Sequence, residues 1–139
     1  MNENWQAGHE LMVGMMGPEF AKAIEAGATS GGFAADVARM AIEHAFGSVW
    51  SRPGLELKYR SAVVIGALIA QHQPAELKNH LRFGLNNGLT VLELQEIIIQ
   101  TLPYVGFPAI SSALTVAIEV LRERGLDGGV KKADESGLL

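Results

Sequence analysis

The stretch that decides the fold is LELKYRSAVVIGALIAQ, residues 55–71. Its second half, residues 62–70, is apolar without a single charge, and no strand-like alternation runs through it. A helix that is apolar all round is buried by its neighbours. We therefore predict a central helix over residues 55–71, buried on every side. The apolar run is far shorter than the roughly 20 residues that a membrane-spanning helix needs.

The rest of the chain also has helical spacing, because glycine and proline fall between long segments rather than inside short ones. The last helix has the clearest pattern, an amphipathic stripe from Ile110 to Leu121 that ends before Gly125. We predict an all-α fold, a single-domain bundle of about six helices. The other predicted helices lie near residues 5–13, 18–26, 32–46, 74–86 and 91–102.

Local signals predict where several of these helices begin and end. Thr29 and Ser30 offer a cap for the third helix. Residues 48–54 are expected to form an ordered loop, since proline and glycine stand together there. Pro103 and Gly106 are expected to break the helix that precedes them.

The clearest junction lies between residues 74–86 and the helix that follows. Pro74 suits the first turn of a helix, and Asn87–Gly88 closes it with a left-handed residue. Thr90 with Glu93 has the spacing of a capping box. Two helices joined by a short turn are therefore predicted here.

Composition excludes whole classes of function. The 139 residues are 48% hydrophobic and 19% charged, which is typical of a folded globular chain. The net charge of −4 gives no general attraction to nucleic acid or to an anionic membrane. The absence of cysteine removes disulfides, zinc–thiolate sites, thiol nucleophiles and dithiol redox chemistry. It also fits a cytoplasmic protein, which we expect here because the chain starts without a signal-peptide pattern.

The predicted organisation is a helical extension over residues 1–30, a main domain over 31–125 and a flexible tail over 126–139. The helices that hold residues 62–70 and 97–99 are apolar on more than one face. They need more cover than one small chain supplies, so we expect a homo-oligomer with a large apolar interface. The alternative is a tight monomer whose central helix is wrapped by the others.

Positive charge gathers in the middle of this acidic chain. Residues 44–92 hold five lysines or arginines against two acids. Such a segment around the most buried helix suits a small anionic ligand. The alternative is that Lys58, Lys78 and Arg82 lie on solvated helix faces. Arg60 differs, because it stands one turn before the apolar run, where an unpaired cation is costly.

Glu76 and His80 are the sharpest candidate pair for chemistry. Four residues apart on one helix, they face the same way, so the carboxylate can orient the imidazole and raise its pKa. That arrangement suits a general acid or base, although most such pairs are ordinary surface contacts. A metal site that adds His72 and His44 is a lesser alternative, since no metal-ligand motif is present.

Tyr104 and the absent motifs complete the inventory. The sequence lacks the glycine-rich nucleotide loops and the serine nucleophile elbow. Tyr104 has two equal interpretations: it donates a hydrogen bond into a pocket, or it fills a turn.

Three segments together resemble a known family. They are FGSVWSRPGL at residues 46–55 with Arg60–Ser61, ELKNH at 76–80 with LNNGLT at 85–90, and YVGFPA at 104–109. In order and spacing, from about residue 33 to residue 121, the chain resembles the carboxymuconolactone decarboxylase family. The resemblance implies an all-helical fold that commonly assembles as a hexamer, so a homotrimer or homohexamer is expected.

The broader superfamily includes alkylhydroperoxidase-like proteins with a Cys-x-x-Cys-x-x-x-His motif and an upstream glutamate. When that histidine is matched to His80, Gln73 and Glu76 stand where the cysteines would be, and Ser61 stands near the glutamate. No thiolate can form, so the chain is not expected to be a thiol peroxidase. The decarboxylase branch of the superfamily is the one that fits.

The resemblance implies loss of CO2 from 4-carboxymuconolactone, which gives the enol-lactone of β-ketoadipate in aromatic catabolism. The unsaturated lactone carbonyl accepts the electron pair itself, so no cofactor is expected. We assign Arg52 and Arg60 to carboxylate binding and Trp50 to a wall that excludes water. His80, oriented by Glu76, is the candidate proton donor, and Tyr104 is a further substrate-binding candidate.

Two other functions stay open at this point. One is a different proton-transfer reaction, an isomerisation or ring opening of a related carboxylate, that uses the same His80. The other is a non-catalytic oligomeric binding protein of the same fold. All three take a small anionic ligand and a second copy of the chain as partners, and none involves nucleic acid or a membrane.

Overall fold

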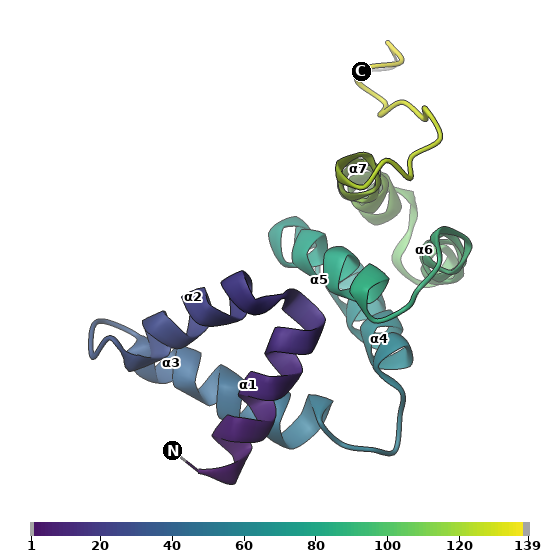
Figure 1. Cartoon of the computed structure of the whole chain (residues 1–139). Helices are drawn as coiled ribbons and strands as arrows, with labels where there is room; N and C mark the ends of the chain where they lie inside the picture. Colours follow the sequence, from purple (N-terminus) through teal and green to yellow (C-terminus); the bar gives the residue numbers. More distant parts are fainter. Residues whose placement is uncertain (1, 138–139) are drawn as a thin grey trace. The chain divides into compact units, whose positions relative to one another are not determined.

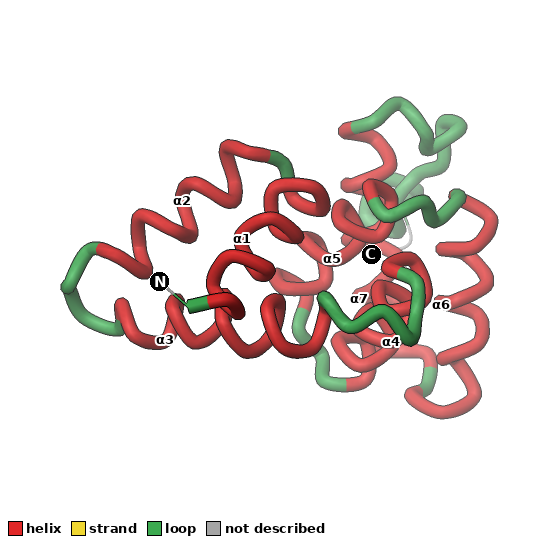
Figure 2. The backbone as a smooth tube through the Cα atoms, turned by 60° about the horizontal axis from the view of Figure 1, so that its bottom comes forward, coloured by secondary structure: helices red, strands yellow, loops and turns green. Residues whose placement is uncertain are grey.

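The computed structural model describes residues 2–137, and these form seven α-helices and one π-helical segment with no strand (Figures 1 and 2). The all-α prediction is confirmed. The described helices group into two compact units, one that ends at Leu57 and one that begins at Lys58. Across residues 2–137, no helix has both the length and the apolarity to cross a lipid bilayer.

The first unit contains α1 (Glu3–Met16), α2 (Pro18–Thr29), α3 (Ala35–Met40) and the π-helix η1 (Ala41–Trp50). Its core packs aromatic, methionine and aliphatic side chains between α1, α2 and η1, among them Trp5, Met12 and Ile42. The backbones of α1 and η1 touch at Gly8 and Gly47, where a β-carbon would collide with main-chain atoms. Only glycine permits this close approach.

The predicted limits of the third helix were wrong at both ends. Thr29 lies in the last turn of α2, where its hydroxyl donates to the Glu25 carbonyl, and α3 instead follows Ala34 in the left-handed region, φ 64°. At the other end, helical backbone continues through Ser48 to Trp50. The Ser48 hydroxyl donates to the Glu43 carbonyl five residues back, which suits the wider turn of a π-helix.

The second unit contains α4 (Leu57–Ala70), α5 (Pro74–Asn86), α6 (Val91–Val105) and α7 (Phe107–Glu123). Its core lies between the four helices and includes Ile65 and Leu81. The predicted stripe of α7 is confirmed at Ile110, Ala113 and Ala117, which are buried.

The helix α4 is not buried on every side within one chain. Ser61, Ile65 and Ile69 face the core, whereas Val63 is 66% exposed. Within the second unit, one face of α4 is thus buried while Val63 stays exposed. The helix α6 also differs from the prediction, because Pro103 lies inside it and the helix ends at Gly106. Near a helix end, proline removes only a single ladder hydrogen bond.

The end of α5 is a Schellman motif. The Leu89 amide donates to the Gly84 carbonyl, and the Gly88 amide donates to the Leu85 carbonyl. Gly88 has φ 102°, the positive φ that glycine tolerates and that was predicted for Asn87–Gly88. The capping box of Thr90 with Glu93 is confirmed as the start of α6.

Ion pairs hold the segment that follows α7 against that helix. The Arg122 guanidinium contacts the Glu135 carboxylate at 2.7 Å, and the Lys132 ammonium contacts Glu119 at 3.4 Å. Residues 138–139 of the predicted tail lie outside the described residues, as does residue 1 of the predicted extension. The predicted division into extension, domain and tail stays a prediction.

Candidate active site

The candidate catalytic histidine lies in a helical hairpin formed by α4 and α5. Residues near the start of α4 contact residues near the end of α5, as the bond between Ser61 and Asn87 shows. On α5, His80, Gly84 and Asn87 recur at helical spacing and share one face. His80 is half-buried, and its ring meets the Phe83 ring edge-on at a centroid distance of 5.3 Å.

The predicted direction of the His80 pKa was wrong. Burial lowers the pKa of His80 below its ordinary value of 6.5, and the nearby Glu76 charge raises it by less. Glu76 is exposed on α5, so water screens its charge, whereas His80 loses solvent within the protein. The imidazole is therefore neutral at pH 7 before any ligand binds.

Sequence reasoning missed the most buried polar group. Ser61 is completely buried in α4, and its hydroxyl accepts a hydrogen bond from the Asn87 side-chain amide at 3.0 Å. One signal was available, because Ser61 is a hydroxyl residue at the edge of a long apolar run. Such a residue needs a partner when buried, and Asn87 in the LNNGLT segment supplies it.

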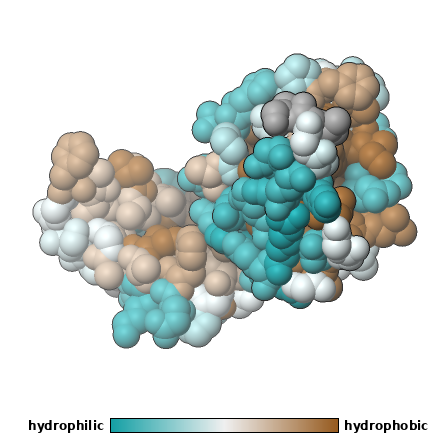
Figure 3. Space-filling model, turned by 90° about the horizontal axis from the view of Figure 1, so that it is seen from above, coloured by the Kyte–Doolittle hydropathy of each residue, from teal (hydrophilic) through white to brown (hydrophobic). Residues whose placement is uncertain are grey.

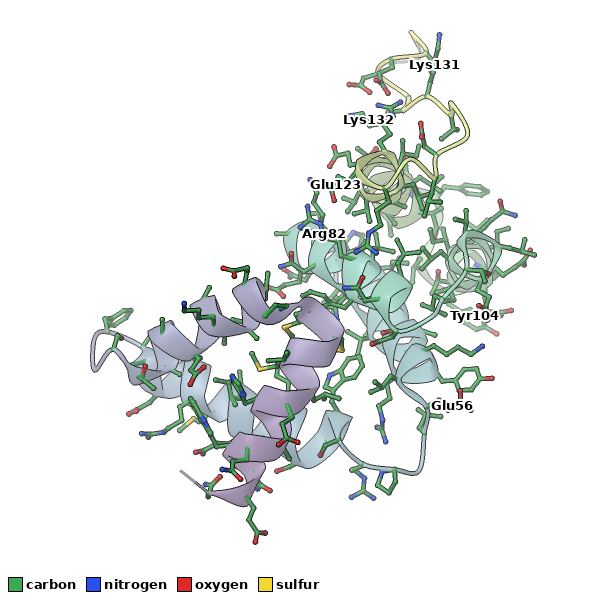
Figure 4. The ribbon with its side chains drawn as sticks, viewed as in Figure 1. Glu56, Arg82, Tyr104, Glu123, Lys131 and Lys132 are labelled. Carbon is green, nitrogen blue, oxygen red and sulfur yellow. The ribbon has the colours of Figure 1, made fainter. Side chains whose placement is uncertain are left out.

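The remaining predicted site residues of the second unit lie at different places. Arg60 is half-buried in the first turn of α4, next to Ser61. Tyr104 lies in the last turn of α6, is 82% exposed and projects outward (Figure 4). Its exposure excludes the interpretation in which it fills a turn. Its role as a substrate-binding residue stays a prediction.

Trp50 and Arg52 belong to the first unit. Trp50 is the last residue of η1, is buried and packs at a tilt against Phe46, with ring centroids 6.3 Å apart. Arg52 is exposed in the turn that follows. The predicted roles of Trp50 as an apolar wall and of Arg52 in carboxylate binding stay predictions.

Most of the predicted positive charge is already neutralised by acids of the same chain. Arg82 contacts Glu123 at 2.6 Å, and Lys78 contacts Glu119 at 3.3 Å, so α5 is tied to α7 (Figure 4). Lys58 likewise contacts Glu93 at 3.5 Å. The structure favours the alternative of ordinary surface charges for these three residues. The roles of Arg52 and Arg60 in carboxylate binding stay predictions.

The metal alternative receives no geometric support from the described residues. Among residues 2–137, no three histidine, aspartate or glutamate side chains gather as a metal site would require. His72 is exposed in the turn between α4 and α5, with φ 55°.

Apolar surface remains open on the second unit. A cavity of about 500 Å³ lies on α4 and α6, and one of about 620 Å³ lies between α6, α7 and the segment that follows α7. Apolar side chains are visible on the molecular surface (Figure 3). We call the first of these the α4–α6 surface; it includes Tyr59, Val63, Gly66 and Ile97.

Comparison with known proteins gives one family match. The profile of the carboxymuconolactone decarboxylase family matches residues 35–119. The chain is 45% identical over 82 residues to 4-carboxymuconolactone decarboxylase of Acinetobacter baylyi, which covers 59% of this chain and 61% of that protein. It is 37% identical over 94 residues to nitrosuccinic acid decarboxylase of Metarhizium robertsii. That alignment covers 68% of this chain and 65% of the relative. The chain thus spans somewhat less than two thirds of the length of these relatives.

Proposed function

The chain belongs to the carboxymuconolactone decarboxylase family, and we propose that it is a cofactor-free decarboxylase that acts on a small anionic substrate. The observation that carries the proposal is the 45% identity over 82 residues to a 4-carboxymuconolactone decarboxylase. The family match over residues 35–119 includes the α4–α5 hairpin. The second relative is also named as a decarboxylase, of nitrosuccinic acid. The substrate that fits best is 4-carboxymuconolactone.

The two substrates named for the relatives share a chemical property. In each, loss of CO2 leaves an electron pair that the substrate itself accepts, on an unsaturated lactone carbonyl or on a nitro group. The bond to the carboxylate carbon breaks, CO2 leaves, and the pair moves to oxygen. A proton then adds to carbon. The protein has to bind an anion, exclude water and deliver that proton.

His80 is the proton donor in this proposal. Its pKa is lowered by burial, so the free enzyme holds it neutral at pH 7. A bound dicarboxylate brings negative charge close to the ring, which raises the pKa and favours uptake of a proton from water. The protonated ring, stabilised by Glu76, then donates to the substrate carbon. A proton donor with a pKa near the working pH is the most efficient one.

Arg60 of α4 pairs with a substrate carboxylate, because guanidinium groups bind carboxylates in a bidentate manner. The same role is proposed for Arg52 of the first unit. Trp50 excludes water, and Tyr104 donates a hydrogen bond to substrate. No cofactor is needed, since the substrate accepts the electrons.

We also propose that copies of the chain associate through the α4–α6 surface. Val63 and Tyr59 on this surface are 66% and 47% exposed. Large exposed apolar areas of this kind are typical of protein interfaces. A homotrimer or homohexamer is the assembly that the family resemblance implies, and a cytoplasmic location is proposed from the absence of cysteine.

The test is direct incubation with 4-carboxymuconolactone and, separately, with nitrosuccinate, while CO2 release is measured between pH 6 and 8. Release from either supports the proposal, and the faster one identifies the substrate class. His80→Ala is expected to abolish release while circular dichroism stays unchanged. His72→Ala, which removes an exposed histidine, is the matched control and is expected to keep full activity.

Each alternative function has its own signature in the same assay. If the protein converts the lactone but releases no CO2, its reaction is another proton transfer and the proposed decarboxylation is wrong. Binding of the lactone without any conversion, unchanged in His80→Ala, would leave a binding protein and overturn the enzyme proposal.

A further inference from the structure

We propose that the hydrogen bond between Ser61 and Asn87 is a positioning pair that sets the register of α5 against α4 and thereby places His80. The kinetic part of this inference rests on the proposed function. The structural part stands on the geometry of the hairpin alone.

The pair is buried and directional. Ser61 is 0% exposed, and the Asn87 amide nitrogen lies 3.0 Å from its hydroxyl oxygen. Asn87 is the C-cap of α5, next to Gly88 with its positive φ. Because the Schellman motif fixes the backbone at this point, the amide is held at a defined place relative to the helix.

The apolar contacts around the pair are less selective for register. Ile65 and Ile69 of α4 share one core with Leu77 and Leu81 of α5, and such aliphatic contacts are non-directional. Aliphatic side chains of similar size can exchange places when one helix slides by a turn. A shift of α5 along α4 that separates Asn87 from Ser61 breaks their hydrogen bond. The buried Ser61 hydroxyl then loses the Asn87 amide as its partner, and this cost in free energy disfavours the shifted register.

Gly84 adds a steric check on the same register. A β-carbon at this position would lie 2.9 Å from the Leu89 Cδ1 atom, 3.2 Å from the Ile65 Cδ1 atom and 3.6 Å from the Ser61 β-carbon. Gly84 thus faces Ile65 and Ser61 of α4 with little room for a side chain between the helices. Asn87 lies about one turn after Gly84, so this contact and the hydrogen bond to Ser61 together define one arrangement of the hairpin.

His80 is fixed through the same helix. It lies one turn before Gly84 and two turns before Asn87, on the shared face of α5. Seven residues of α-helix span about 10 Å, over which the helix moves as a rigid rod. A displacement at Asn87 therefore carries His80 with it and changes how deeply the other helices bury the imidazole.

The test compares Ser61→Ala and Asn87→Ala with Asn86→Ala. Asn86 is the neighbouring asparagine, and its side chain accepts from Arg124, just beyond α7, instead. In the two pair variants we expect kcat to fall roughly ten- to hundredfold, the loss typical of a small misplacement of a catalytic group, with KM within about twofold. The double variant should lose no more than either single variant, because the two residues act as one unit. Asn86→Ala should keep kcat.

A second readout does not depend on activity. The pKa of the His80 ring is measured by NMR titration of the ligand-free protein, with the resonance assigned through His80→Gln. The pair variants should move this pKa toward 6.5, whereas Asn86→Ala should leave it in place. An unchanged His80 pKa in folded Ser61→Ala and Asn87→Ala proteins would overturn the inference, even if the chain proves to be no decarboxylase. Absence of activity in the unmodified protein with a shifted His80 pKa in the variants would overturn the proposed function alone.

Discussion

The Asn87 side chain, at the end of α5, donates a hydrogen bond to the completely buried Ser61 hydroxyl of α4. Its neighbour Asn86 accepts one from Arg124, just beyond α7, at 2.8 Å. Thr90 then starts α6 with a capping box. The LNNGLT segment thus connects α5 to three other helices. Its two asparagines have different partners, which the sequence alone does not reveal.

Replacement of Gly84 by alanine should destabilise the protein. The new methyl group would press on Leu89 and Ile65, and overpacking of this kind costs about 1–3 kcal/mol. Urea unfolding followed by circular dichroism measures the loss. Gly27→Ala in α2 is the control: a β-carbon there meets nothing within 4 Å, so we expect unchanged or slightly increased stability. Equal stability of the two variants would contradict the close helix contact.

Stability should fall as the pH is lowered below about 6.5. His80 has a lowered pKa in the folded protein, so the unfolded chain binds the proton more readily. The contribution of neutral His80 is complete above its ordinary pKa of 6.5 and is lost as the pH falls through the lower folded value. Urea unfolding at pH 7.5 and 5.5 should show a smaller pH effect in His80→Gln than in His72→Gln. A pH effect of the same size in both variants would refute the lowered pKa.

Removal of the α6 cap should weaken the second unit. The Thr90 hydroxyl accepts from the Glu93 amide at 3.0 Å, and the Glu93 carboxylate accepts from the Thr90 amide at 3.0 Å. Thr90→Ala should lower the free energy of unfolding by about 0.5–2 kcal/mol. Thr115→Ala is the control, since the Thr115 hydroxyl only donates to a carbonyl inside α7. A larger loss in the control than in Thr90→Ala would count against the cap.

The segment that follows α7 should detach when its ion pairs are removed. The hydrogen bonds from Arg122 lower the pKa of Glu135 to about 2, so the pair persists to low pH. Glu135→Gln should increase amide hydrogen exchange over residues 130–137, and high salt should act in the same direction. Glu10→Gln, on the exposed side of α1, should leave this exchange unchanged. Unaltered exchange in Glu135→Gln would show that other contacts hold the segment.

A charge on the α4–α6 surface should separate the copies. Val63→Asp introduces a carboxylate that is tolerated in a single chain, where the residue is 66% exposed, but not in an apolar interface. The molar mass from light scattering is expected to fall toward the 14.9 kDa of one chain. Val37→Asp, equally exposed at 66% on α3, is the matched control. If only Val37→Asp reduces the mass, the interface lies elsewhere.

Local signals decided much of the second unit. The predicted helix over residues 74–86 has the observed bounds of α5, because Pro74 and Asn87–Gly88 act through their own backbone. The capping box was equally local. The third helix was misjudged because its start at Ala34 and its π-helical turns have no simple side-chain signature. The π-helix η1 packs against α1, where Gly8 and Gly47 bring the backbones together.

The chemistry of the site divides in the same way. From sequence alone, His80 and Glu76 had to share a helical face, since spacing along one helix fixes direction. The pKa of His80, the partner of Ser61 and the pairing of Lys78 and Arg82 with α7 followed only from the fold. Desolvation and contacts between distant segments depend on which helices pack together. The residues adjacent in the sequence do not determine that packing.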